Sequence, residues 1–501
     1  MKAHPVLSAL SLQVGGTDAP ALWLARLADL RIVQRLGLPS VCELTFSDPD
    51  GRLGDTALTQ AGGELQVSVG APGDALFSGD ISGLAYLYES GDGRQLRVRA
   101  YDRLGRLARR QKQRTFAQTS LLEVAGELVA DLGIDVACDL PDVAIDHAIQ
   151  HEQTDLRFLS DLAARNGLYA FLAGRTLRLV ALRGARPAPD AVIEMAMGRE
   201  LLEARFSRND MAACASVSAH GWNSATAEVH RAMAEHGAAP GETSGFASAT
   251  SLANRAFCDD AHAERHAQAE FDFHAARASG MAGVANGDPR LRPGARVAVE
   301  GVARALRGPY LLAAVSHTVS AESGYVSEIE TTPQRPPSES RGTSLTLGSV
   351  FRTDDPQALG RVQLTLPALG EVTTDWVKTV SPWAGAGKGF MSQPDTGDIV
   401  LFAFFDADPA HGVVLGSVYG GAPPRDWSRS ARGQCYALVT PGGQKIRFDD
   451  AGGSTHVEIA NGSYIQLSPK ETVIHACGAL RIEAPGEALT LRARTIDLER
   501  A

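Results

Sequence analysis

Apolar and polar residues alternate along the last part of the chain, between Lys445 and Glu499. A period of two is typical of a strand with one buried and one solvated face. Turn signals such as Asn461-Gly462 and Pro485-Gly486 separate the repeats, so the pattern predicts seven short strands. The apolar pairs that define them are Ile446/Phe448, Val457/Ile459, Ile465/Leu467, Leu480/Ile482, Leu489/Leu491 and Ile496/Leu498, and a further pair, Val473/His475, has one polar member.

Such a ladder of strands has too few apolar side chains to form a core of its own. Each strand offers two or three of them, and a narrow sheet has exposed edges. The simplest solution is for identical copies to wind around a common axis and pool their apolar columns. The pattern therefore predicts an intertwined oligomeric β-prism over residues 425–501. The alternative is a monomeric sandwich edge that packs on the upstream domains.

Period-two alternation also fills the first hundred residues. Val41-Cys-Glu-Leu-Thr-Phe and Gln95-Leu-Arg-Val-Arg-Ala both alternate, and glycine-containing breaks lie between such segments. We therefore predict a first β-barrel over residues 1–105.

Helical periods interrupt the strands after this barrel. A capping-box sequence at 120–123 opens one helix, and Gly133 is placed to end it. A second helix is predicted over 154–166, followed by a hairpin over 169–180. We assign residues 106–195 to an α+β insertion.

Strands return over residues 196–331, which we predict to be a second β-barrel with one long Ala-rich helix at about 251–279. The Pro-rich segment 332–341 is a linker. About five short strands over 342–424 suit a small closed barrel, an OB-fold. The fold class predicted from the pattern is mainly β and multidomain: two β-barrels with an α+β insertion, an OB-fold and the C-terminal prism.

Composition fits this picture. A chain of 501 residues exceeds the size of one core, and 44% hydrophobic and 21% charged residues are ordinary for a globular protein. The net charge of −10 does not favour nucleic acid as a partner. The six cysteines are scattered, and no apolar run is long enough to span a bilayer. The first residues lack a signal-peptide pattern, so we expect folding and assembly in the cytoplasm.

One helical segment carries residues that suit metal chemistry. Cys258, His262, His266, Glu270 and His274 follow one another at intervals of four, so neighbours in this series share a helix face. However, neither the H-E-x-x-H motif nor its inverted form is present. We therefore favour a polar helix face turned to solvent or to a neighbouring protomer over a metal site.

Two glycine-rich segments resemble catalytic loops only in part. Gly385–Gly389 lacks the Walker spacing, because Pro382 stands where that motif needs a glycine. Gly241–Gly245 has a threonine where a nucleophile elbow has serine. We interpret the first as a barrel loop and exclude the second as a nucleophile.

A basic cluster lies between the first barrel and the insertion. It has no interleaved aromatic residues, so a solvated surface or an acidic protein neighbour is favoured over nucleic acid. Its members are Arg106, Arg109, Arg110, Lys112 and Arg114.

His475 is a candidate because of its place in the repeat. If it shares the inward column with Val473, copies of the imidazole converge near the prism axis. Ile474 competes for the same face. Converging imidazoles can hold water, an anion or a metal, and we favour a neutral, water-bridged layer.

Several segments together resemble the VgrG-type spike family of contractile injection systems, which includes phage hub and spike proteins. Val98-Arg-Ala-Tyr-Asp-Arg-Leu-Gly-Arg-Leu is similar to the end of the family's first barrel, and Gly287-Asp-Pro-Arg-Leu-Arg-Pro-Gly to the entry of its second. The most specific segments are Trp383-Ala-Gly-Ala-Gly-Lys-Gly-Phe-Met and Pro394-Asp-Thr-Gly-Asp-Ile-Val-Leu-Phe, which resemble the family's OB-fold. Gly443-Gln-Lys-Ile-Arg-Phe-Asp-Asp matches the passage into its β-prism.

The resemblance implies a homotrimer whose two hub barrels adapt to a hexameric inner tube protein and to baseplate proteins. It also implies a three-chain prism that carries a PAAR-type tip protein, with effector cargo as a further partner. We expect no effector domain after Ala501, and the compact length resembles extracellular, phage-tail-like systems rather than longer type VI forms. The particle would act outside the cell and meet a target membrane only on piercing.

From the residues and the resemblance together, we predict a structural spike that transmits force at the tip of a contractile injection system. It is not expected to be an enzyme, and we assign no catalytic residue, cofactor or metal. The alternatives are a peptidoglycan-degrading or metal-dependent enzyme of a tail assembly, which would use the His262 helix, and a trimeric receptor-binding fibre protein.

Overall fold

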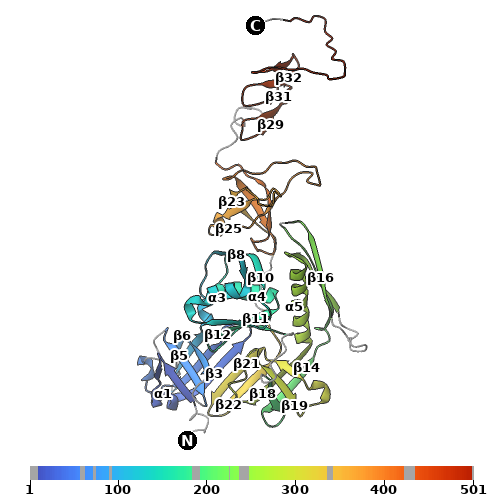
Figure 1. Ribbon diagram of the computed structural model, residues 1–501. Coiled ribbons are helices and arrows are strands. Elements are labelled where there is room, and N and C mark those ends of the chain that lie inside the picture. The colour runs from blue at the N-terminus through green and yellow to red at the C-terminus, as the bar shows by residue number, and fades with distance from the viewer. Residues whose placement is uncertain are drawn as a thin grey trace. The chain divides into compact units, whose positions relative to one another are not determined.

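The computed structural model describes residues 10–56, 62–70, 75–89, 93–182, 192–224, 226–235, 248–335, 342–421 and 435–498. The chain divides into two compact units, Met1–Val418 (unit 1) and Tyr419–Ala501 (unit 2), which are described separately. The mainly β, multidomain class predicted from the sequence is confirmed (Figure 1). Within the described residues, no helix has the length and apolar character needed to cross a membrane.

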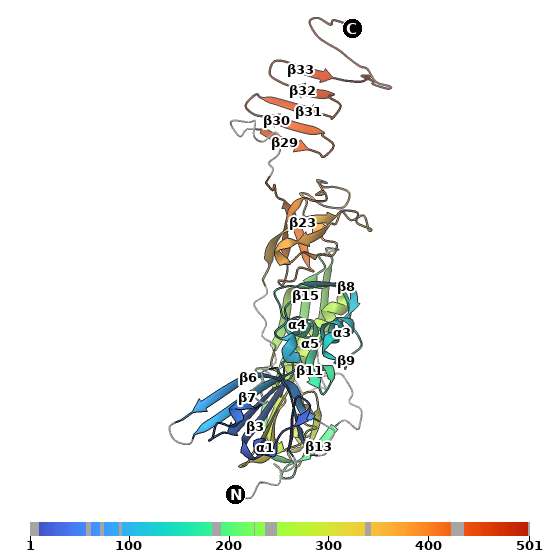
Figure 2. The same cartoon turned by 90° about the vertical axis from the view of Figure 1, so that its left-hand side faces the viewer.

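Unit 1 is built on one curled sheet of 11 strands that draws on both predicted barrel regions (Figure 2). Antiparallel pairing of β3 with β21 joins the two regions, for example at Ile32↔His317. In order across the sheet, the strands are β14 (Leu201–Arg208), β18 (Ser279–Asn286), β22 (Gly324–Glu330), β21 (Ala314–Ser320), β3 (Leu27–Arg35), β4 (Val41–Ser47), β7 (Arg94–Asp102), β6 (Ala75–Tyr88), β5 (Glu64–Val69), β1 (Leu10–Val14) and β2 (Thr17–Asp18).

Alternation along these strands places the core on one face of the sheet. Leu30 and Ile32 of β3, Leu44 and Phe46 of β4 and Val98 of β7 are buried in one cluster. The short helix α1 (Ala21–Arg26) precedes β3, and the short helix α2 (Leu104–Leu107) follows β7. A three-stranded sheet of β13 (Val192–Ala196), β19 (Arg296–Glu300) and β20 (Pro309–Leu311) contributes to a second cluster with β14, β18, β21 and β22.

The α+β insertion forms as the capping signals predict. Helix α3 (Leu121–Val129) begins with a complete capping box, in which Ser120 accepts from the Glu123 backbone and Glu123 accepts from the Ser120 backbone. Gly133 takes the left-handed conformation beyond it, at a φ of 60°. Helix α4 (Asp155–Arg165) is capped by Thr154. The strands of this region are β8 (Arg114–Ser120), β9 (Asp135–Cys138), β10 (Ala144–Gln150), β11 (Leu168–Ala173) and β12 (Thr176–Ala181).

The long Ala-rich helix starts later than the sequence indicated. Residues 248–256 form strand β17 (Ser248–Ala256), and helix α5 covers Asp260–Ala278. The predicted helical start at about residue 251 is therefore wrong. Strand β17 pairs in parallel with β15 (Cys214–Trp222), which also pairs with β16 (Val229–Glu235). Asp259 caps helix α5 by accepting a hydrogen bond from the His262 backbone at 2.6 Å. Tertiary strand pairing has overridden a composition that favours helix.

The predicted OB-fold region holds six short strands around one core. They form the order β25-β24-β23-β27-β28-β26, and their core includes Val350, Leu364, Phe402 and Val414. The strands are β23 (Ser344–Arg352), β24 (Gln363–Leu366), β25 (Val372–Thr373), β26 (Lys378–Thr379), β27 (Ile399–Phe404) and β28 (Gly412–Ser417).

Unit 2 contains a five-stranded antiparallel meander (Figure 2). Its strands are β29 (Cys435–Val439), β30 (Lys445–Asp449), β31 (Ser454–Glu458), β32 (Tyr464–Leu467) and β33 (Thr472–His475). The pairs from Leu480 to Leu498, which the sequence also assigned to strands, form no strand among the described residues of this single chain. A strand is defined by pairing with a neighbour, and these residues pair with no other part of the chain that the structure describes.

Candidate functional site

Cross-strand pairing in unit 2 lines up apolar side chains on one face of the meander. Each member of the first row lies opposite the next, through the pairs Leu438↔Ile446, Ile446↔Val457, Val457↔Ile465 and Ile465↔Ile474. Because side chains at every second position share a face, Tyr436, Phe448 and Leu467 belong to the same side. We call this set the apolar column: Tyr436, Leu438, Ile446, Phe448, Val457, Ile465, Leu467 and Ile474.

The apolar column is open to solvent in the single chain. Its exposed fractions run from 39% at Ile446 to 62% at Tyr436. None of the described residues of unit 2 is buried. A contiguous exposed apolar surface of this kind indicates a site of interaction with another chain.

His475 lies on the opposite face from the one the sequence suggested. It pairs with Tyr464, while Ile474 pairs with Ile465 and continues the apolar column. The imidazole stacks on the Tyr464 ring at 5.1 Å, and His456 stacks on the other side of that ring at 5.0 Å. The interpretation of His475 as the polar break in the apolar column is therefore wrong, because β33 is one residue out of phase with the Val473/His475 pair.

A second site in unit 1 joins helix α4 and strand β17 to the loop between β27 and β28. Arg165 of α4 binds Asp408 at 2.7 Å, and Arg255 binds Asp406 at 3.0 Å. The His151 ring contacts the Ala407 carbonyl oxygen at 2.9 Å. Asp406 and Ala407 both have left-handed backbones, with φ of 53° and 51°. Such strain persists only where surrounding contacts fix it, so Arg165, Arg255 and His151 hold the loop in place.

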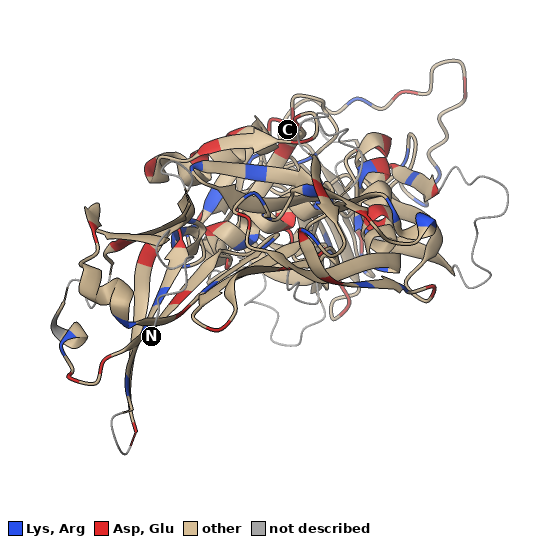
Figure 3. Ribbon diagram, turned by 90° about the horizontal axis from the view of Figure 1, so that it is seen from below, with Lys and Arg blue, Asp and Glu red and all other residues tan. Residues whose placement is uncertain are grey.

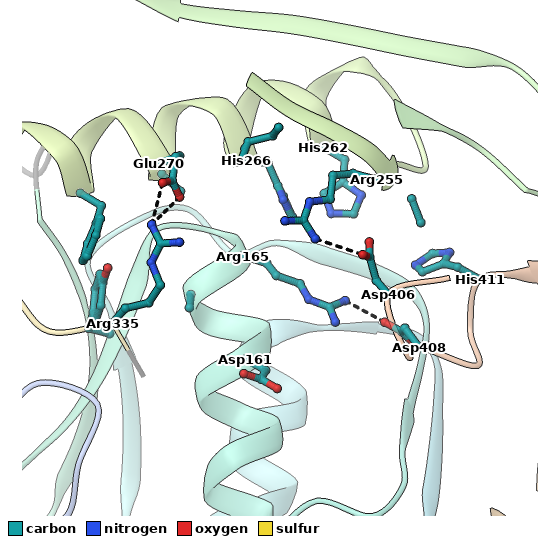
Figure 4. Close-up of a pocket in the computed structure, with 16 residues that line it drawn as sticks. Asp161, Arg165, Arg255, His262, His266, Glu270, Arg335, Asp406, Asp408 and His411 are labelled. Carbon is teal, nitrogen blue, oxygen red and sulfur yellow. Dashed lines mark hydrogen bonds and ion pairs between the residues drawn. The ribbon is translucent and has the colours of Figure 1, made fainter. Parts of the chain in front are cut away.

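His262 and His266 face this loop across a cavity of about 370 Å³ (Figure 4). Their rings lie 4.8 Å apart, and His411 and Asp408 line the same cavity. Burial lowers the pKa of His262 to about 4, helped by His411 and nearby arginines. Burial also lowers the pKa of His266 well below its usual value, helped by His262 and nearby arginines. The predicted polar face turned to solvent or another protomer is therefore wrong for these two residues: they face a cavity within their own chain.

Charged side chains around this cavity form ion pairs with one another, such as Arg165 with Asp408 and Arg335 with Glu270. Among the described residues, no group of three or more His, Cys, Asp or Glu side chains is arranged to hold one. Glu270, the fourth member of the predicted series, instead binds Arg335 at 2.6 Å and His274 at 3.2 Å. Burial alone would raise the pKa of Asp408, but Arg165 and His411 lower it to about 2. The cavity is therefore lined by neutral imidazoles and by charged side chains that form ion pairs within the chain.

Three arginines of the basic cluster form ion pairs with acidic residues of the same chain. Arg106 binds Asp80, Arg114 binds Asp155 at 2.6 Å, and Arg110 binds both Asp155 and Asp131. For Arg110 and Arg114, whose side chains are 21% and 15% exposed, the expected solvated surface is wrong, whereas Arg106 is solvated as expected, at 47% exposure. Basic and acidic residues are interspersed over the ribbon rather than gathered by sign (Figure 3).

The remaining sequence candidates are loops or fall elsewhere. Gly385 and Lys388 bridge each other in a loop of the OB-fold, as expected for a barrel loop. Gly241–Gly245 lies outside the described residues. Sequence reasoning missed a Ser327–His317 pair, with Oγ and Nδ1 2.9 Å apart. Both residues are fully buried, so this pair holds strands β21 and β22 together and meets no substrate.

Similar proteins agree with this architecture. A family model described as "Phage tail baseplate hub (GPD)" matches residues 43–323, and one described as "Type VI secretion system/phage-baseplate injector OB domain" matches residues 346–419. The type VI secretion system spike protein VgrG4b of Pseudomonas aeruginosa is 33% identical over 88 residues. That match spans 16% of this chain and 11% of the length of that protein.

Solved structures share the fold at low identity. The 43 kDa tail protein of prophage MuSo2 from Shewanella oneidensis has a TM-score of 0.52 at 14% identity, covering 65% of this chain and 98% of that one. An Escherichia coli component of the type VI secretion system has 0.53 at 13%, covering 81% and 99%. VgrG of Francisella, solved with PdpA, has 0.55 at 7%, covering 93% and 87%. With the hub model matching more than half of its residues, the chain belongs to the phage tail baseplate hub family.

Proposed function

We propose that this protein is the homotrimeric spike of a contractile injection system, which joins the inner tube and baseplate to a tip and pierces the target envelope. Its partners would be a hexameric inner tube protein, baseplate proteins, a PAAR-type tip protein and effector cargo. The particle would be assembled in the cytoplasm and act outside the cell. The membership of the hub family and the injector-type OB domain support this role.

The single observation that carries the proposal is the exposed apolar column of unit 2. Fully burying a side chain such as Ile, Leu, Val or Phe contributes about 1.5–3 kcal/mol. The meander leaves Ile446, Phe448, Ile465 and Leu467 between 39% and 50% exposed, so as a single chain it forgoes roughly two fifths to a half of that free energy. Three copies that turn these columns towards a shared axis would recover it.

The same arrangement suits a mechanical task. Interlocked strands from three chains resist shear, because displacement must break many backbone hydrogen bonds and expose a shared core at once. The polar opposite face, with Arg447, His456 and Gln466, would remain in water.

Light scattering on the purified full-length protein tests the proposal. A homotrimer has a mass of about 159 kDa, three times the 52.9 kDa of one chain. A stable particle of 52.9 kDa would overturn the spike reading.

A binding experiment separates a spike from a receptor-binding fibre. The trimer should co-sediment with assembled rings of the inner tube protein from the same system, whereas a fibre should bind target cells in the absence of other tail proteins. Binding to cells alone, without rings, would favour the fibre.

A further inference from the structure

The OB-fold carries apolar side chains on the outside of its barrel as well as inside. Along β27, Val400, Phe402 and Phe404 are buried in the core, so Ile399 and Leu401 point outwards. The neighbouring strands add outward-pointing leucines. We call this set the outer apolar face: Leu345 and Leu347 of β23, Ile399 and Leu401 of β27, and Leu415 of β28.

Strand register makes the outer apolar face continuous. Leu347 lies opposite Leu401, and Leu401 lies opposite Gly416 of the next strand, beside Leu415. Leu345 is 61% exposed, Leu347 49% and Leu415 43%. The outer face of a small barrel in water is normally polar, so a three-strand apolar surface indicates a contact with another protein.

The same domain has a second apolar surface on the loop between β26 and β27. We call Trp383, Phe390 and Met391 the apolar loop; they are 82%, 41% and 97% exposed. The loop is braced by its own hydrogen bonds, from the Phe390 backbone to the Pro382 carbonyl at 3.1 Å and between Gly385 and Lys388 at 3.0 and 3.2 Å.

The shape of the loop holds its largest side chain in solvent. Trp383 has a φ of 60°, a left-handed conformation that costs free energy for a bulky residue. The hydrogen bonds and the strained backbone fix the conformation of the loop, so its apolar side chains stay exposed instead of folding back onto the barrel. The Trp383 ring is therefore available to a partner without rearrangement.

We propose that the apolar loop of one copy packs on the outer apolar face of the next copy, so that the OB-folds form a closed ring. The inference rests on the proposed trimer and adds to it the pair of surfaces that meet. A ring of three copies needs a heterologous interface, in which two different patches of each copy are used once. The OB-fold presents two such patches, and both are apolar.

A second copy is the occupant that the chain itself supplies. Only residues 418–434 lie between the end of β28 at Ser417 and the start of β29 at Cys435. Copies whose apolar columns associate thus hold their OB-folds within reach of one another, at effective concentrations of about a millimolar. At such concentrations even a small apolar contact is occupied.

Disulfide trapping between two variant chains tests this pairing. One chain carries Met391→Cys and the other Leu345→Cys, both in a Cys477→Ser background, because Cys477 is the exposed one among the native cysteines, all of which are free. The two chains are co-expressed, oxidised and run without reductant. We expect a two-chain band that appears in the mixture and is lost on reduction.

Three comparisons make the outcome decisive. Each single variant, expressed alone, shows how much of the two-chain band comes from two identical engineered cysteines or from native cysteines. A band from either variant as strong as that of the mixture would overturn the pairing of loop and face. A mixture of Met391→Cys with Met211→Cys, an 83% exposed hub residue, supplies the background for an unrelated exposed site. If light scattering shows three chains but the mixture gives only this background, the loop-to-face contact is wrong while the trimer stands; a single-chain mass defeats the proposed function itself.

Discussion

The hydrophobic clusters of unit 1 close within one chain, whereas unit 2 leaves its apolar side chains in solvent. Leu30, Phe46 and Phe402 are fully buried in unit 1, but Ile465 and Leu467 of unit 2 are 46% and 50% exposed. Both regions use the same alternation of apolar and polar residues. The difference is whether a second layer of the same chain covers the apolar face.

This contrast indicates two sources of stability in one protein. Unit 1 should fold and keep its structure as a single chain, because its cores and ion pairs are complete. Unit 2 should gain most of its stability from association, so its folding depends on protein concentration. Damage to one unit should therefore leave the other's behaviour intact.

The largest effect is expected from a charge in the apolar column. Ile465→Asp would place three carboxyl groups at the shared core, and protonating each costs roughly 4 kcal/mol at pH 7. We expect the trimer to dissociate in light scattering while the calorimetric transition of unit 1 persists. Gln466→Asp, one residue along on the polar face, is the matched control. Equal masses for the two variants would contradict the assignment of the faces.

A buried ion pair tests the prediction that unit 1 is stabilised by contacts within one chain. Asp155 has a fully buried side chain that binds Arg110 and Arg114 and accepts from Gln150 at 2.8 Å. Asp155→Ala leaves two guanidinium groups without this partner, so unit 1 should lose about 3–5 kcal/mol in its free energy of unfolding. The readout is thermal or urea unfolding of the full chain.

The control for this variant shares one of its arginines. Asp131→Ala removes a 65% exposed partner of Arg110 and should cost about 1 kcal/mol or less. The trimer mass should survive both substitutions, since neither touches unit 2. Loss of the trimer in Asp155→Ala would show that the two units are not independent.

Acid should weaken unit 1 through its buried histidines. Burial lowers the pKa of His317 to about 4, and that of His262 likewise, against about 6.5 in an unfolded chain. Between pH 6.5 and 4 the unfolded state binds protons that the folded state does not, so stability is complete above pH 6.5 and is lost as pH falls. The expected loss is at most about 3 kcal/mol per histidine.

Unfolding of unit 1 at several pH values between 7.5 and 4 measures this loss. His317→Gln should flatten the dependence on pH, and the exposed His220→Gln serves as the comparison. An unchanged slope in His317→Gln would show that the His317 imidazole takes up its proton in the folded state as well.

Local signals predicted most of the elements correctly. The capping box at Ser120, the left-handed Gly133 and the alternation of β27 each act over a few residues, so sequence alone identifies them. The Ala-rich tract failed at its start because pairing of β17 with β15 is a contact between distant segments. The same cause explains why the joining of both barrel regions through β3 and β21 was not foreseen.

The candidate sites were harder to predict, for two physical reasons. The face of His475 depends on the register of β33, and a shift of one residue reverses every side chain. The environment of His262 and His266 depends on a loop some 140 residues away, around His411. A series at intervals of four predicts a shared helix face, but what covers that face is set by tertiary structure.

The smallest effect we predict tests whether unit 1 responds to local changes as an autonomous fold should. Ser120 accepts from the Glu123 backbone at 3.2 Å, and Glu123 accepts in return at 3.0 Å. Ser120→Ala removes the first of these bonds and should lower the free energy of unfolding by about 1 kcal/mol, with no change in trimer mass. Ser120→Asp keeps an acceptor at the same place and should restore most of the loss. A drop several times larger for Ser120→Ala would mean that β8 and α3 are held together mainly through this cap, and that the core of the insertion contributes less than its buried leucines imply.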